Sequence, residues 1–288
     1  MIGKTKTLKF TSLFSLILFS LIINSFVFGN FLIVNIFLTF FLISVLITKY
    51  GLKIIKQLNL IQNIRDEGPS FHFSKKNTPT MGGIFIILPF LLLLLIVKNS
   101  FDSIGILSLF FCTLGFFIIG FLDDFLSITN KKNTGLIVYE KFFLQTIVSI
   151  IFIVIGFQSN SISHFFSISN DWNIDTDLII VPICFLILVG LSNAVNLTDG
   201  LDGLATVPVI LVAACFAFIS YVAGNIIFSD YLQITYIEGT GEISIFCGAI
   251  IGSCLGFLWF NAPPAKIFMG DTGSLALGGS LGAVGIIT

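Results

Sequence analysis

Repeated apolar runs are the feature that most limits how this chain can fold. A helix needs about 20 mainly apolar residues to cross a hydrocarbon core of about 30 Å, and such runs are predicted at 31–49, 81–97, 103–122, 142–157, 178–192, 204–223 and 243–260. A further run begins near Ser274 and is cut off at Thr288. Only 10% of the residues are charged, whereas soluble domains carry about 25%. The sequence therefore predicts an all-α, polytopic transmembrane helical bundle in one integral domain, 1–288.

The first apolar stretch, 10–29, has three interpretations. It follows Lys4, Lys6 and Lys9, and no small-residue cleavage site comes after it. It is therefore a further span, an interfacial helix, or the hydrophobic region of an uncleaved signal. With this alternative open, we expect eight to nine spans.

Positive charges alternate between the predicted loops. Lysine and arginine gather in loops 49–80 and 123–141 and at Lys266, whereas the intervening loops 98–102, 158–177 and 224–242 hold only Lys98. Because positively charged residues stay on the cytoplasmic side of a membrane, the first set of loops is predicted to be cytoplasmic.

Four polar segments interrupt the apolar sequence, at 78–83, 123–124, 193–203 and 268–274. Ionisable groups cost free energy near hydrocarbon unless they are paired, metal-bound or wet, so acidic clusters here are functional candidates. All four segments follow alternate spans. We therefore expect them to meet on the cytoplasmic face, although they are far apart in the sequence.

Asp123 and Asp124 close one apolar run. Adjacent side chains point about 100° apart on a helix, so the pair is not expected to share one proton. One carboxylate can bind a metal while the other orients or deprotonates a substrate. The plainer interpretation is a pair of interfacial charges that end the helix.

A polar stripe lies between two later runs. Asn193, Asn196, Asp199 and Asp202 recur every three residues, which brings successive side chains near one another on a helical face. Carboxylate and amide oxygens are hard ligands, suited to Mg²⁺ together with a nucleotide phosphate. The alternative is a stripe that only caps two helices.

A turn-rich segment precedes the last apolar run. A helix that begins near Thr272 or Ser274 would present unpaired N–H groups to an anion, and Asp271 would face the same pocket as a metal ligand. Phe268 is placed either to stack on a planar base or to anchor the chain at the membrane interface.

The segment 78–83 ends a basic loop and starts a helix. Lys75 or Lys76 can neutralise a phosphate there, although basic residues beside a membrane also contact anionic lipids. His72 and His164 are predicted on opposite faces, so they form no metal site. Walker A, nucleophile-elbow and zinc-protease motifs are absent from the sequence, which leaves carboxylate and Mg²⁺ chemistry on phosphates.

Taken in order, these motifs resemble the phospho-N-acetylmuramoyl-pentapeptide transferases, a branch of the polyprenyl-phosphate N-acetylhexosamine-1-phosphate transferases. The resemblance runs from about residue 60 to the end and is carried by 66–75, 78–83, 120–124, 193–205 and 268–279. It implies transfer of phospho-MurNAc-pentapeptide from UDP-MurNAc-pentapeptide to undecaprenyl phosphate, giving lipid I and UMP. It also implies a ten-span fold, a need for Mg²⁺, and a place in the bacterial inner membrane with the site on the cytoplasmic face.

The resemblance also assigns roles by motif position. Asp271 and Asp124 would ligate the metal, and Asp123 would act as a base or handle the lipid phosphate. Phe268 would lie against uracil. The remaining residues expected to bind substrate are Lys75, Thr80, Asn196, Asp199 and Asp202. Homodimers are common in the family, and no nucleic-acid partner is expected.

Two departures from the family pattern matter. Ser127 stands where the family usually has lysine, and Lys131 or Lys132 would then supply the charge. The family's His-rich loop and final spans would lie beyond Thr288, so we expect a C-terminally truncated chain that by itself is inactive or poorly folded. The rival interpretations are a sister GlcNAc-1-phosphate transferase, an inactive membrane remnant, and a transporter, which would need acidic residues at mid-membrane depth.

Overall fold

The computed structural model describes residues 32–58, 78–97, 104–130, 135–158, 165–169, 172–175 and 179–288. Most of them are helical. The helices are α2 (Leu32–Gln57), α3 (Gly83–Val97), α4 (Ile104–Thr129), α5 (Val138–Gln158), α6 (Ile180–Thr198), α7 (Thr206–Ala223), α8 (Ile226–Leu232), α9 (Thr240–Asn261) and α10 (Asp271–Ile287). The stretch 10–29 and Lys75 lie outside the described residues.

The predicted helical bundle is confirmed. Within the described residues, 6 helices are long and apolar enough to cross a membrane, namely α2, α4, α5, α6, α7 and α9. Helix α10 has 17 residues and α3 has 15, and both are apolar. Each of the eight predicted runs therefore corresponds to one helix, and the chain is a multi-pass membrane protein.

Several helices extend beyond the apolar runs that predicted them. Helix α4 continues to Thr129, so Asp123 and Asp124 lie inside a helix, and α5 begins at Val138, which places Lys141 in its first turn. Hydropathy marks only the part of a helix that faces hydrocarbon, whereas the backbone hydrogen bonds continue into polar sequence. The polar segments consequently lie on helix ends as well as on loops.

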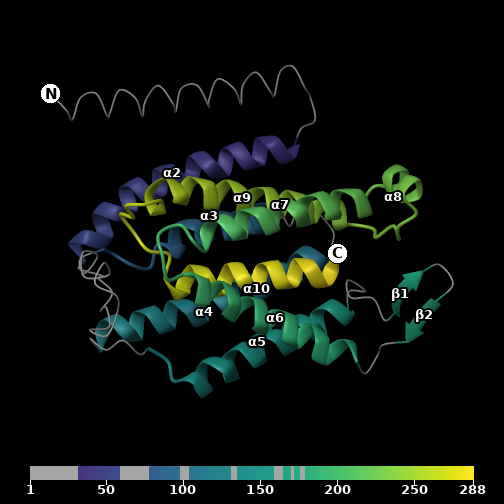
Figure 1. The fold of residues 1–288 in the computed structure, drawn as a ribbon, viewed down its shortest axis with the longest axis horizontal. Coiled ribbons are helices and arrows are strands. Elements are labelled where there is room, and N and C mark those ends of the chain that lie inside the picture. Colours follow the sequence, from purple (N-terminus) through teal and green to yellow (C-terminus); the bar gives the residue numbers. More distant parts are fainter. Residues whose placement is uncertain are drawn as a thin grey trace.

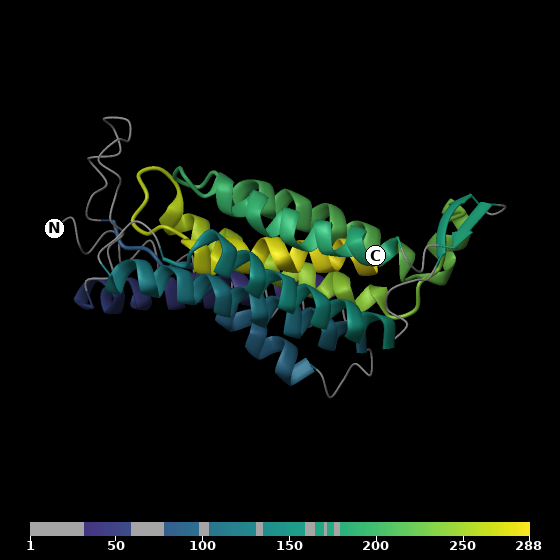
Figure 2. The same cartoon turned by 90° about the horizontal axis from the view of Figure 1, so that it is seen from below.

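Helix α10 lies in the middle of the bundle (Figure 1). It packs against α3, α4, α6 and α7, and all its residues from Thr272 to Val284 are buried. Helix α9 packs against α2, α3 and α7. By contrast, α5 buries only five of its 21 residues and presents an apolar surface outward. Seen from below, the helices run roughly along one common direction (Figure 2).

The two ends of the bundle differ. Helix α8 and a short antiparallel hairpin both lie at one end, and the loop that leads into α10 lies at the other (Figure 1). The hairpin pairs β1 (Phe165–Ser169) with β2 (Trp172–Asp175). It is an addition to the predicted all-α fold, because it falls in a loop where hydropathy gives no signal.

Close backbone contact joins α4 to the start of α10. A Cβ atom at Gly120 would overlap the backbone carbonyl of Asp271. Small residues at such positions let membrane helices approach each other closely. This contact places the carboxylates that follow Gly120 on α4 next to the first turn of α10.

We expect Gly120→Ala to lower the free energy of unfolding by about 1–3 kcal/mol, because the added methyl group meets backbone that cannot move aside. Denaturant unfolding in detergent micelles measures this change. The matched control is Gly190→Ala in α6, where a Cβ atom would meet nothing within 4 Å. Equal stability of the two variants would contradict the close packing of α4 on α10.

Candidate active site

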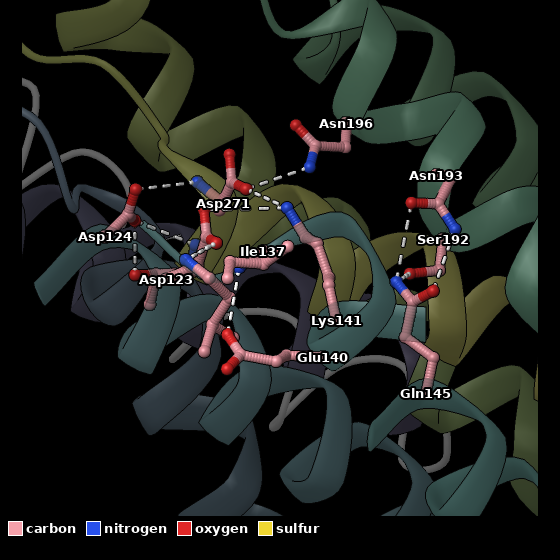
Figure 3. A network of polar contacts seen from close by, with 12 residues as sticks. Asp123, Asp124, Ile137, Glu140, Lys141, Gln145, Ser192, Asn193, Asn196 and Asp271 are labelled. Carbon is pink, nitrogen blue, oxygen red and sulfur yellow. Dashed lines mark hydrogen bonds and ion pairs between the residues drawn. The ribbon is translucent and has the colours of Figure 1, made fainter. Parts of the chain in front are cut away.

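Asp271, the first residue of α10, is the centre of the polar network (Figure 3). Its Oδ2 atom forms an ion pair with Nζ of Lys141 and accepts a hydrogen bond of 3.0 Å from Nδ2 of Asn196. Lys141 Nζ also lies 3.5 Å from Oδ2 of Asp123. Four helices, α4, α5, α6 and α10, therefore contribute side chains to one cluster.

Asp124 binds the first turn of α10. Its Oδ1 accepts a hydrogen bond of 3.2 Å from the backbone N–H of Asp271, and its Oδ2 accepts bonds from the N–H of Thr272 at 2.9 Å and its hydroxyl at 2.6 Å. The Asp124 side chain is buried. It satisfies N–H groups that have no partner within the helix and places negative charge at the positive end of the helix dipole.

Asp199 holds the residue just before α10. It follows the last residue of α6, and its Oδ2 accepts a hydrogen bond of 3.0 Å from the N–H of Gly270. Burial, and then the negative charge of Asp271, raise the pKa of the Asp199 carboxyl well above its ordinary value.

These contacts correct the prediction for the start of the last helix. Helix α10 begins at Asp271, earlier than Thr272 or Ser274, and its first N–H groups are not open to an anion. Asp124 accepts from two of them, and the N–H groups of Gly273 and Ser274 donate to the carbonyl of Gly270. The acidic side chains cap the helix, so these N–H groups are not available to a phosphate.

Asp123 and Asp124 face different partners, as expected for adjacent residues on a helix. Oδ1 of Asp123 accepts a hydrogen bond of 2.8 Å from the N–H of Leu136, and Oδ2 faces Lys141. Asp123 therefore orders the segment that leads into α5 and also lies beside the centre of the cluster.

The cluster contains more carboxyl groups than cations. Among the described residues, Lys141 is the cation of the cluster and pairs with Asp123 and Asp271, while Asp124 and Asp199 bind the start of α10. The side chains of Lys141, Asp123 and Asp271 keep exposures of 18%, 14% and 23%. A positively charged group that reaches these three residues would be stabilised by the carboxylates.

The described residues contain no group of three or more His, Cys, Asp or Glu side chains arranged to hold a metal ion. The donor chemistry nevertheless fits Mg²⁺, which usually binds through one or two carboxylates and completes its shell with water and substrate phosphate oxygens. Asp271 offers partly exposed carboxylate oxygen, whereas both oxygens of Asp124 already accept hydrogen bonds from α10.

Thr80 lies behind the turn into α10. It is buried, and within the described residues its hydroxyl has no hydrogen-bond partner. A Cβ atom at Gly270 would come within 2.9 Å of this hydroxyl, so Thr80 supports the turn from inside. Gly270 adopts a φ of 73°, a conformation that glycine takes without strain.

Phe268 is fixed through its backbone. Its N–H donates to the carbonyl of Pro79 at 2.8 Å, and its own carbonyl accepts from the N–H of Gly82 at 2.9 Å. The side chain remains half-buried. The segment 78–83 thus holds the loop before α10, which explains why these two motifs lie together.

Asn261 connects the two loops that carry Asp202 and Phe268. Its Oδ1 accepts hydrogen bonds from the N–H of Gly203 at 3.1 Å and the hydroxyl of Thr206 at 3.0 Å, and its Nδ2 donates to the carbonyl of Ile267 at 2.9 Å. Asp202 adds a second tie, because its Oδ2 accepts from the N–H of Ala265 at 3.1 Å.

Sequence reasoning missed the roles of Lys141 and Asn261. Lys141 is a lone lysine beside an apolar run, so only its helical position and the fold place it against Asp271. The suggested substitutes for the charge missing at Ser127, Lys131 and Lys132, lie outside the described residues. In the described part of the chain, Lys141 provides positive charge beside Asp123.

The helical bundle and the acidic cluster at one end define a multi-pass membrane protein with a polar site at the ends of its spans. Glycosyl transferase family 4 matches residues 106–288, and signature 1 of phospho-N-acetylmuramoyl-pentapeptide-transferase matches residues 75–87. The chain belongs to the phospho-N-acetylmuramoyl-pentapeptide-transferases of this family, which confirms the resemblance seen in the motifs.

Similar proteins cover most of the chain. The phospho-N-acetylmuramoyl-pentapeptide-transferase of Prochlorococcus marinus subsp. pastoris is 60% identical over 291 residues, which is 100% of this chain and 77% of the relative. The protein of the same name from Pelagibacter ubique is 49% identical over 259 residues, 88% of this chain and 71% of the relative. That of Rickettsia bellii (strain OSU 85-389) is 49% identical over 245 residues, 83% and 68%.

We expect Asp124→Ala to destabilise the protein by about 1–3 kcal/mol, because buried N–H groups of α10 lose their acceptor. Thermal unfolding in detergent measures the loss. Leu122→Ala is the control on the same helix, since Leu122 is 39% exposed on the outer surface. If Asp124→Ala is no less stable than Leu122→Ala, the capping role of Asp124 is wrong.

Proposed function

We propose that this chain transfers phospho-MurNAc-pentapeptide from UDP-MurNAc-pentapeptide to undecaprenyl phosphate, forming lipid I and UMP. Family membership supports the reaction, and one observation supports the site. Lys141 and Asn196, from different helices, contact the same carboxylate oxygen of Asp271 at the end of the membrane spans. A lipid phosphate and a water-soluble nucleotide sugar can meet at such a position.

The reaction joins two anionic substrates. An oxygen of the lipid phosphate attacks the phosphorus next to the sugar, and the bond to UMP breaks. The positive charge of Lys141 lies where it can offset the charge of both phosphates. A two-step route through a covalent enzyme intermediate would use the same residues, but direct attack needs fewer steps.

Asp123 is our candidate for the base that removes a proton from the lipid phosphate. Its Oδ2 lies beside Lys141, so a phosphate bound by the lysine would be within its reach. The hydrogen bond from Leu136 to the other oxygen fixes the orientation of the carboxylate.

Asp271, with Asp124 as the second predicted ligand, would hold Mg²⁺. When bound, the ion supplies positive charge that screens repulsion between the phosphates and stabilises the leaving UMP. The exposed part of Asp271 favours it as the main ligand, while Asp124 orients it through the first turn of α10.

The nucleotide sugar is proposed to lie between the loops that Asn261 joins. Phe268 would stack on uracil, and Asp202, Asp199 and Asn196 would bind the rest of the nucleotide sugar, with Lys75 beyond the described residues. Thr80 would act on the substrate through the turn at Gly270, since the threonine itself is buried. The cytoplasmic face of the bacterial inner membrane is the proposed location of this site, and the lysine-rich loops support it because positive residues stay on the cytoplasmic side.

Lipid I formation in liposomes that contain undecaprenyl phosphate tests the function. We expect labelled product from UDP-MurNAc-pentapeptide and none from UDP-GlcNAc. Two proteins are compared: the 288-residue chain and a chimera that continues after Thr288 with the sequence of the Prochlorococcus relative. The comparison tests whether residues beyond Thr288 are needed. Product from UDP-GlcNAc would replace the proposed function with that of the sister transferase, and no product from either substrate with either protein would refute it.

We expect Lys141→Met to reduce the rate of transfer by about 10²- to 10³-fold, because a fixed positive charge at the reacting phosphates is lost. Initial rates of lipid I formation measure the effect. Glu140→Gln is the control. Glu140 is exposed, and its Oε2 accepts a hydrogen bond from the N–H of Ile137. Equal rates for both variants would remove Lys141 from the reaction.

A further inference from the structure

A second polar contact joins α5 and α6 beside the acidic cluster (Figure 3). Nδ2 of Asn193 donates to Oε1 of Gln145 at 3.0 Å, and Nε2 of Gln145 lies 3.5 Å from Oδ1 of Asn193 and 3.4 Å from Oγ of Ser192. Gln145 and Ser192 are buried. Asn193 therefore faces α5, and its place in the polar stripe of the sequence does not bring it to Asp271.

The sequence spacing relates this pair to the cluster. Gln145 follows Lys141 by one helical turn on α5, and Asn193 precedes Asn196 by about one turn on α6. Residues three or four apart lie on the same face of a helix. The same two helix faces thus meet twice, once through the amide pair and once through the two side chains that contact Oδ2 of Asp271.

Helix α5 also packs on α4, where Val148 lies against Gly115, so the amide pair acts together with this packing. Helix α5 buries only five of its 21 residues, and Gln145 is one of them. Lipid tails are as apolar as leucine, so hydrophobicity alone does not favour one rotation of a membrane helix over another, whereas interhelical hydrogen bonds and close packing do. A rotation of about 20° moves a group about 6 Å from the helix axis by about 2 Å, enough to break a hydrogen bond.

We propose that Gln145 and Asn193 are positioning residues for the transfer reaction. Their reciprocal amide pair holds α5 against α6 at the rotation that brings Lys141 and Asn196 to the same oxygen of Asp271. The pair touches no substrate in this arrangement. Its effect on the reaction passes through Lys141, and this part of the inference rests on the proposed function.

Spin-label distances test the positioning without any assay of activity. Val138 on α5 and Leu197 on α6 are 78% and 86% exposed, so cysteines there accept labels. The native Cys215 is exposed and would also take a label, so the labelled proteins carry Cys215→Ser. We expect Gln145→Met to shift the distance between the labels by about 2 Å or to broaden its distribution. Thr146→Val is the control, because the Thr146 hydroxyl bonds only within α5 to the carbonyl of Phe142.

Kinetics of lipid I formation test the consequence. We expect Gln145→Met to lower kcat by about 10- to 100-fold with little change in KM for the nucleotide sugar, because the misplaced group acts in the reaction itself. The loss should disappear in a Lys141→Met background, since residues that act through one another are not additive. Exchanging the two amides, with Gln145→Asn and Asn193→Gln in one protein, should restore most of the rate.

Three results would overturn the proposal. The first is a distance between the labels that Gln145→Met leaves unchanged. The second is a full additional loss of rate when Gln145→Met is added to Lys141→Met. The third is a rate for Gln145→Met no lower than that for Thr146→Val. If the distances shift but no variant and no parent protein forms lipid I, the positioning of α5 stands and the proposed function fails.

Discussion

The site depends on the hydrogen bonds between buried carboxylates and the start of α10. Asp124 accepts from the N–H groups of Asp271 and Thr272, and Asp199 accepts from that of Gly270. These bonds satisfy backbone groups that would otherwise be costly in an apolar environment, and they fix where the helix begins. Because Asp271 is the first residue of that helix, the same bonds fix where its carboxylate lies.

The bundle makes these bonds possible through close packing and polar ties. Gly120 lets α4 approach the backbone of α10, and the segment 78–83 pairs with the loop before it. Asn261 holds the two loops on the other side. In lipid such small residues and hydrogen bonds supply the specificity of helix association. An acidic cluster with one described cation is the result, and its partly exposed carboxylates suit a cation that binds together with substrate.

Much of this arrangement follows from the sequence. The apolar runs predict the helices, and the alternation of polar segments predicts that Asp124, Asp199 and Asp271 share one end of the bundle. Lys141 could not be predicted in the same way, because its role depends on the start of α5 at Val138 and on the rotation of that helix. Hydropathy could not predict where α10 begins either, because the hydrogen-bond acceptors that fix its start, Asp124 and Asp199, are distant in the sequence. The hairpin lies in a loop without a periodic apolar pattern.

The central claim is that Asp271, oriented by Asp124, is the carboxylate that meets metal and diphosphate. An experimental structure with Mn²⁺ in place of Mg²⁺ and with UDP-MurNAc-pentapeptide tests it most directly, because anomalous scattering locates the ion. The account predicts an ion bound to Asp271, with Asp124 still accepting from the N–H of Thr272. An ion bound away from Asp271, or bound to an Asp124 that has released α10, would contradict it.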